Sequence, residues 1–161
     1  MQHHARGEFR GYRGTVRDVT EQKRVMEALR RSEELYRSLV DNIDAGIVLI
    51  DAGYRIVAVN PAQARRIGKS QEELIGMYCY RAFENREAIC PECQAEAAMA
   101  GGNPTQCRRL DVRVEGIRHD VLVKAFPLFG PDGTATGFVE LIENISERIR
   151  TEEVLRGAKE A

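Results

Sequence analysis

An internal repeat constrains where a folded domain can begin and end in this chain. Residues 11–34, GYRGTVRDVTEQKRVMEALRRSEE, are echoed by residues 137–160, GFVELIENISERIRTEEVLRGAKE. Each copy has the pattern of a strand that ends in a polar triplet, DVT or NIS, followed by a charged helix. Thr20 and Ser146 are suited to cap these helices. The repeat therefore predicts a strand-to-helix module that occurs in tandem.

The repeat divides the chain into four segments. Residues 1–19 are expected to be the tail of a preceding domain, and residues 20–41 a linker helix. Residues 42–146 would form one complete domain, and residues 147–161 would begin the next linker helix. We therefore expect the chain to be part of a longer protein.

Size and charge narrow the class of protein. A chain of 161 residues is long enough for one domain with a hydrophobic core. Its 24 basic and 25 acidic residues give a formal charge of -1, which argues against nucleic acid as a partner. The longest apolar run, AGIVLI, is far shorter than the roughly 20 residues that span a bilayer, and the N-terminus lacks a signal-peptide pattern. We expect a cytoplasmic protein without a membrane segment.

Hydrophobic patterning predicts an α+β fold with five strands and a helical crossover after the second strand. Residues 45–60 read as two apolar strands around a turn at residues 51–54. Short helices are expected at residues 61–68 and 70–76 and again within residues 79–102. The remaining strands are predicted at residues 106–115, 117–129 and 135–146.

The predicted linker helix carries apolar residues at heptad-like spacings, interrupted by the polar Ser32. This pattern fits either a dimerisation helix or an amphipathic helix that packs on its own domain. The apolar positions are Val25, Leu29, Tyr36, Leu39 and Ile43.

Three segments together resemble the PAS family of sensory domains. They are SEELYRSLVDNIDAGIVLID, VAVNPAQARRIGKSQEELIG and PDGTATGFVELIENISER, and the resemblance covers nearly all of residues 33–161. It implies a five-stranded antiparallel sheet whose concave face, with the helices between the second and third strands, encloses a small pocket. It also implies a place in a bacterial histidine kinase or diguanylate cyclase, with a PAS domain upstream and an output domain downstream.

The resemblance implies a sensory function. The first hypothesis is a non-catalytic module, a homodimer through its linker helices, that senses a ligand, a metal or a redox state. It would relay the signal through the helix junctions at Asp18, Thr20, Asn144 and Ser146. The alternatives are a purely structural dimerisation module and a thiol oxidoreductase. The oxidoreductase is disfavoured because the Cys90–Cys93 pair does not lie in a predicted βαβ unit.

We predict which side chains line the pocket. Asn60, at the end of the second strand, would be its polar anchor. The alternative is that these side chains simply fill the core. The predicted lining residues are Ile47, Val57, Leu74, Tyr78, Phe83, Leu122 and Val139.

Four cysteines form the least ordinary feature of the sequence. Cys79, Cys90 and Cys93 lie within fifteen residues, and Cys107 follows. The CPEC turn can aim two sulfurs at one point, and four thiolates suit zinc or an iron–sulfur cluster. The segment also looks like that of a cysteine-bearing PAS subgroup with a CY…F…CP.C pattern. Buried structural thiols and a redox-active Cys90–Cys93 dithiol stay open as alternatives.

Two cofactors of the PAS family are not expected here. Cys79 follows Gly76 by three residues, as the reactive cysteine does in the flavin-binding branch, but Tyr78 and Tyr80 stand where that branch has asparagine and arginine. Heme would need an axial histidine on the pocket helices. The histidines of this chain are instead His119, in a predicted strand, and His3 and His4, in the N-terminal tail.

Overall fold

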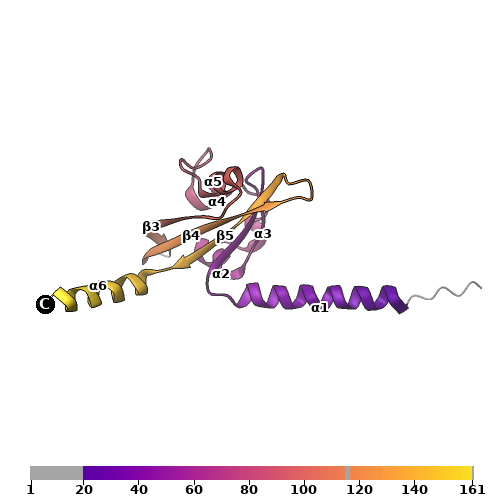
Figure 1. Ribbon diagram of the computed structural model, residues 1–161, viewed down its shortest axis with the longest axis horizontal. Helices are drawn as coiled ribbons and strands as arrows, with labels where there is room; N and C mark the ends of the chain where they lie inside the picture. The colour runs from indigo at the N-terminus through magenta and orange to yellow at the C-terminus, as the bar shows by residue number, and fades with distance from the viewer. Residues whose placement is uncertain (1–19, 115–116, 161) are drawn as a thin grey trace, which may run out of the picture. The chain divides into compact units, whose positions relative to one another are not determined.

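The computed structural model describes residues 20–114 and 117–160 (Figure 1). The chain divides into two compact units, Met1–Tyr36 and Arg37–Ala161, and each is described by itself. The described part of the first unit is the beginning of helix α1 (Thr20–Asn42). A helix is therefore present where the linker helix is expected, and its role as a linker stays a prediction. The predicted strand before Thr20 lies outside the described residues.

The second unit is built on a five-stranded antiparallel sheet in the order β2-β1-β5-β4-β3. All five predicted strands are present, so the predicted α+β class with its antiparallel sheet is confirmed. The last strand of the sequence lies at the centre of the sheet, between β1 and β4. The strands are β1 (Gly46–Asp51), β2 (Ile56–Val59), β3 (Thr105–Val114), β4 (Ile117–Phe129) and β5 (Ala135–Asn144).

Four short helices connect β2 to β3, and a fifth follows β5. Local sequence sets their ends: Asn60 caps α2, whose first residue is a proline, and Gly68 ends it in the left-handed conformation. Ser70 and Glu73 form a reciprocal capping box at the start of α3. The helices are α2 (Pro61–Ile67), α3 (Gln71–Leu74), α4 (Cys79–Glu84), α5 (Gln94–Gly101) and α6 (Ser146–Glu160).

The core lies between one face of the sheet and the crossover helices. Alternate residues of the central strands point into it, so Val48 and Ile50 of β1 and Phe138 of β5 are fully buried. Leu74 packs into the same cluster from α3. Helix α5 contacts β3, β4 and β5 and buries Ala95 and Ala98 completely. We call the sheet face that carries this core the concave face.

None of the described helices combines the length and the apolar composition that crossing a bilayer would require.

Gly137 shows how closely the central strands approach one another. It pairs with Asp51 across the β1–β5 ladder. A Cβ atom at this position would lie 2.2 Å from the backbone oxygen of Ile50, an atom that cannot move aside without disturbing the strand. The sheet therefore requires glycine here.

We predict that Gly137→Ala lowers the free energy of unfolding by about 1–3 kcal/mol, because overpacking against backbone distorts the strand pair. Gly157→Ala in α6 is the matched control, since its added methyl group meets no atom within 4 Å. That control should be neutral or stabilising by up to about 1 kcal/mol. Urea unfolding of the three proteins measures both effects, and equal stability of Gly137→Ala and wild type would contradict this account of the β1–β5 contact.

Candidate functional site

The side chain of Asn60 joins three segments of the chain. Its Oδ1 atom accepts hydrogen bonds from the backbone N–H groups of Ile47 at 2.9 Å and Gln63 at 3.1 Å. Its Nδ2 atom donates to the carbonyl oxygens of Val40 at 3.1 Å and Ala45 at 2.9 Å. Asn60 is itself buried, with 2% of its surface exposed. One carboxamide therefore fastens the last turn of α1 to the start of β1 and the start of α2.

A second set of side-chain bonds fastens α6 to the sheet. The hydroxyl of Ser146 accepts a hydrogen bond from the backbone N–H of Asp120 in β4, at 2.9 Å. Asn144 Oδ1 accepts from the backbone N–H of Ser146 at 3.0 Å, and Asn144 Nδ2 lies 2.9 Å from His119 Nδ1. The structure corrects the predicted role of Ser146. It is the first residue of α6, and its hydroxyl is bonded to β4 because the serine is buried against that strand.

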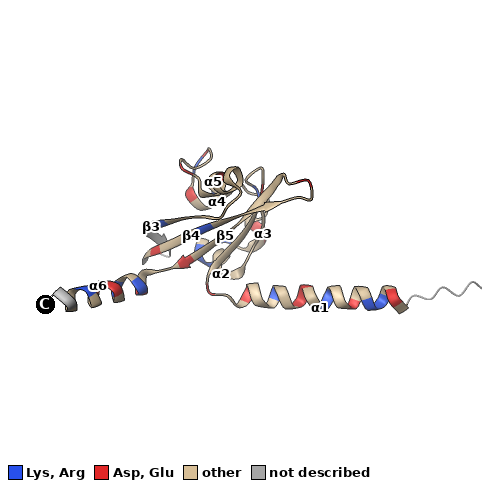
Figure 2. Ribbon diagram, viewed as in Figure 1, with Lys and Arg blue, Asp and Glu red and all other residues tan. Residues whose placement is uncertain are grey.

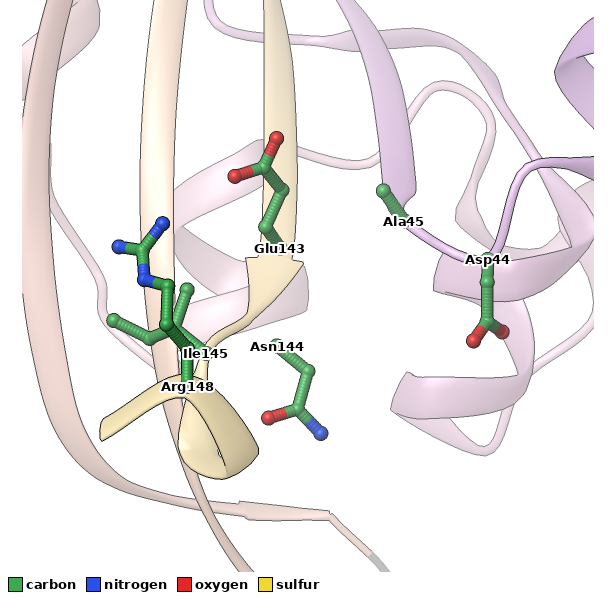
Figure 3. A pocket seen from close by; sticks show the side chains of 6 residues that line it. All are labelled: Asp44, Ala45, Glu143, Asn144, Ile145 and Arg148. Atoms are coloured by element: carbon green, nitrogen blue, oxygen red, sulfur yellow. The ribbon is translucent and has the colours of Figure 1, made fainter. Parts of the chain in front are cut away.

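An open groove of about 310 Å³ lies beside these two junctions (Figure 3). One wall comes from the residues just before β1, and the other from the end of β5 and the start of α6. The lining side chains are mostly charged or polar. They are Asp44, Ala45, Glu143, Asn144, Ile145 and Arg148.

Arg66 of α2 links the crossover helices to the same region. Its guanidinium donates a hydrogen bond to the carbonyl oxygen of Ile142 in β5, at 3.3 Å. Burial lowers the pKa of Arg66, and the negative charge of Asp44 partly offsets that effect. Arg66 therefore interacts electrostatically with the segment between α1 and β1.

The concave face carries a polar cluster that the sequence reading missed. Glu140 of β5 lies opposite Val48 and Ala125, both of which are fully buried. Arg109 of β3 lies opposite the buried Val121, so it shares this face. The guanidinium of Arg109 forms an ion pair with Glu84 of α4. The carboxyl of Glu140 and the Arg109–Glu84 ion pair therefore lie on the concave face, and the ion pair links β3 to α4.

Burial dominates the electrostatics of Glu140. It raises the pKa of this carboxyl from 4.5 to about 7, with a further increase from Glu84 and an opposing effect of Arg109. Burial also raises the pKa of the Cys79 thiol to about 12, and the negative charge of Glu140 adds to the increase. Near neutral pH the cluster thus holds a carboxyl close to its midpoint of titration and a protonated thiol.

All four cysteines are partly buried free thiols. Cys79, Cys93 and Cys107 pack against the core, whereas Cys90 lies in the loop before α5. Among residues 20–114 and 117–160, no three His, Cys, Asp or Glu side chains are placed to hold one metal ion. The predicted zinc or iron–sulfur site at Cys79, Cys90, Cys93 and Cys107 stays a prediction.

Four of the eight residues predicted to line the pocket do not face the core, and the strand register shows why. The structure places Ile47, Leu122 and Val139 on the sheet face opposite the core, and Val57 is 48% exposed. Adjacent residues of a strand point to opposite faces, so an error of one position moves a side chain out of the core. The residues that do face the core next to them are Val48, Ile56, Val121 and Phe138.

The other predicted lining residues have different environments. Leu74 is fully buried, Phe83 packs against the core, and Asn60 forms the junction described above. Tyr78 lies beneath Arg55, whose guanidinium carbon is 4.1 Å from the ring centroid and whose Nη2 donates to the Tyr78 hydroxyl at 2.8 Å. The role of these residues toward a ligand stays a prediction. Of the predicted relay residues, Thr20 begins α1, and Asp18 lies outside the described residues.

Sequence and structure comparisons define the class of protein. Residues 40–150 match the family described as the PAS fold. The PAS domain of BvgS from Bordetella pertussis superimposes with a TM-score of 0.58 at 22% identity, over 84% of this chain and 99% of that chain. The chain therefore belongs to the PAS family, and it is a sensory domain of signal transduction.

Two curated relatives share parts of this sequence. A probable diguanylate cyclase of Escherichia coli, DgcE, is 28% identical over 88% of this chain. Sporulation kinase E of Bacillus subtilis is 37% identical over 37% of this chain. The matched regions span only 13% and 8% of those proteins.

We predict that Asn60→Ala lowers the free energy of unfolding by about 2–4 kcal/mol, because buried backbone groups lose their partners. Asn60→Asp should also destabilise the domain, since it keeps the acceptor for Ile47 but turns an oxygen toward the carbonyls of Val40 and Ala45. The control is Asn103→Ala, which removes an exposed bond to Gly101 and should cost less than about 0.5 kcal/mol. Chemical denaturation at neutral pH measures all three, and an Asn60→Ala effect no larger than the control would contradict the junction.

We predict that Glu140 makes the free energy of unfolding depend on pH. Because its pKa is raised from 4.5 to about 7 in the fold, the folded state holds a proton that the unfolded state releases. Stability should therefore fall as the pH rises through this window, by about 2 kcal/mol, and Glu140→Gln should remove that part of the decline. Denaturation curves of both proteins between about pH 5 and pH 8 test this, and parallel pH profiles would show that the carboxyl is not shielded from water.

Proposed function

We propose that this chain is a non-catalytic PAS module that relays a signal through α1 and α6 to an output domain outside the chain. The observation that carries the proposal is the pair of side-chain junctions at Asn60 and Ser146. Each one ties a flanking helix to the sheet through partly buried hydrogen bonds. The diguanylate cyclase and the sporulation kinase among the relatives support an output of one of these two kinds.

The connections within the sheet support this relay. Strand β5 runs through the centre of the sheet and continues after one residue into α6. The core residues Phe138 and Ile142 and the carboxyl of Glu140 lie on that same strand. A change in packing or charge on the concave face would therefore act on the strand that leads into the exit helix. Strand β1, which pairs with β5, begins at the Asn60 junction.

Exposed apolar residues on α1 support the proposal that the chain associates with a second copy of itself. Its heptad positions are exposed: Val25 by 63%, Leu29 by 59%, Tyr36 by 66% and Leu39 by 55%. Lys, Arg, Asp and Glu residues are interspersed along the rest of the helix (Figure 2). Apolar residues at this spacing are typical of a two-stranded coiled coil. A homodimer would cover them.

The repeat at residues 11–34 supports a PAS domain upstream, which α1 would join to this one. A cytoplasmic location fits the reduced state expected for the four free thiols. The rival function, a thiol oxidoreductase, is less well supported. Cys93 directly precedes α5 in the crossover of an antiparallel sheet, whereas a thioredoxin-like enzyme holds its pair at a strand-to-helix turn of a βαβ unit.

We predict that Leu29→Glu weakens self-association at least tenfold, because it places a charge in the apolar seam. Glu27→Lys alters charge on the side of the helix away from that seam and should leave the association nearly unchanged. Sedimentation velocity over a range of concentrations measures the dissociation constants. Equal weakening by both substitutions, or a monomeric wild type, would contradict dimerisation through this seam.

We predict that Ser146→Ala loosens the start of α6, because the hydroxyl that accepts from Asp120 N is lost. Amide exchange in the first turn of α6 should become about 5–10 times faster, as expected for one net hydrogen bond. Thr151→Val is the matched control, since it removes a hydroxyl bond to Glu147 O within the helix and touches no strand. Hydrogen exchange followed by mass spectrometry distinguishes them, and unchanged exchange in Ser146→Ala would argue against a relay through this junction.

A further inference from the structure

The loop between α4 and α5 brings two cysteines together through a tight turn. Pro91 and Glu92 are its central residues, and Cys90 and Cys93 are its ends. Glu92 has a φ of 55°, in the left-handed region. Proline followed by a residue with positive φ is the pattern of a type II turn, whose first and fourth Cα atoms lie within about 7 Å.

This geometry meets the main requirement for a disulfide. Cα atoms of bonded cysteines are usually about 4.4–6.8 Å apart. Both thiols are partly accessible, and the two residues between them are exposed, so a small reagent can approach the turn. The turn thus brings the backbones of the two cysteines close enough to favour a bond between them.

The other two cysteines are placed differently. Cys79 begins α4 and packs against the core. Burial raises the pKa of the Cys79 thiol to about 12, and burial also raises the pKa of the Cys90 thiol, so the distinction between them rests on position in the fold. Cys107 lies on β3 opposite the buried Val123. Sequence separation and turn geometry thus favour the Cys90–Cys93 pair over any pairing with Cys79 or Cys107.

We propose that Cys90 and Cys93 form a reversible disulfide when the chain meets a low-molecular-weight disulfide such as oxidised glutathione. One thiolate attacks a sulfur of the reagent, forms a mixed disulfide and expels one glutathione thiolate, which takes up a proton. The second cysteine then attacks its neighbour's sulfur and expels the other glutathione. The protein loses two electrons and two protons, and one oxidised glutathione becomes two reduced molecules.

The bond would act on the helix that covers the concave face. The carbonyl oxygen of Cys93 accepts from Ala97 N at 3.2 Å, and Thr105 Oγ1 of β3 donates to Gln94 O at 2.6 Å. A disulfide would fix the exposed loop to this first turn of α5. The proposed Cys90–Cys93 disulfide does not depend on the proposed relay. Its formation can be measured whether or not the flanking helices carry a signal.

The test equilibrates the whole 161-residue chain with glutathione buffers of increasing oxidised fraction, followed by acid quenching, alkylation, trypsin and tandem mass spectrometry. Cleavage after Arg86 and Arg108 leaves Cys90, Cys93 and Cys107 on one peptide, whereas Cys79 lies on another. The expected product is the first peptide lighter by two hydrogen atoms, with Cys107 alkylated. Cys107→Ser should form the same bond, and Cys90→Ser and Cys93→Ser should not.

Substitutions of Glu92 test whether the conformation of the turn favours the disulfide. Glu92→Gly should keep the bond, because glycine accepts a positive φ, while Glu92→Val should lower the equilibrium constant about tenfold, because a β-branched residue resists it. Three results would overturn the proposal: four alkylated thiols in the most oxidising buffer, a cross-link between the two peptides through Cys79, or a persistent glutathione adduct in place of the bond. Equal equilibrium constants for the two Glu92 variants would also contradict the role of the turn.

Discussion

The carboxamide of Asn60 is the interaction on which the arrangement of this domain depends. It is buried, and it uses both its oxygen and its nitrogen twice, so that four backbone groups from three segments are satisfied at one point. Few side chains can do this, because both donors and acceptors are needed within one planar group. The end of α1, the start of β1 and the start of α2 therefore cannot shift independently without leaving buried polar groups unpaired.

The second junction completes the path from helix to helix. Ser146 links the start of α6 to β4, while β5 connects that helix directly to the centre of the sheet. The concave face between these junctions carries charged side chains as well as apolar ones. Glu140, Arg109 and Glu84 lie there at a cost in desolvation. In our proposal, this polar cluster is where a change of charge on the concave face would alter the packing against β5.

The sequence was sufficient to predict the elements but not the faces of the strands. Polar triplets, glycines and prolines mark the element ends, which is why all five strands and the crossover helices appear where the patterns predict them. In β1, however, Gly46 to Ile50 has no polar residue, so alternation cannot show which side chains face the core. In β5, the half-buried Glu140 on the core face makes Val139 and Leu141 look like the core residues.

Some features of the sequence do indicate the faces of the strands. Lys124 shares the outer face of β4 with Leu122, and its polarity indicated that face in advance. The Pro91–Glu92 turn was visible as CPEC, but its left-handed residue was not, since glutamate rarely adopts that conformation. The bonds of Asn60 to Val40, Ala45 and Ile47 and the bond of Ser146 to Asp120 join residues far apart in the sequence, and no local pattern predicts them.

The central claim is that buried side chains fasten both flanking helices to the sheet. Residue-resolved amide hydrogen exchange of the wild-type chain tests it most directly, at the N–H groups of Ile47 and Asp120, whose acceptors are the side chains of Asn60 and Ser146. The account predicts that both exchange as slowly as the amides within the β1–β5 ladder. Exchange at the rate of the exposed residues around Gly133 would show that the junctions open freely, and would contradict it.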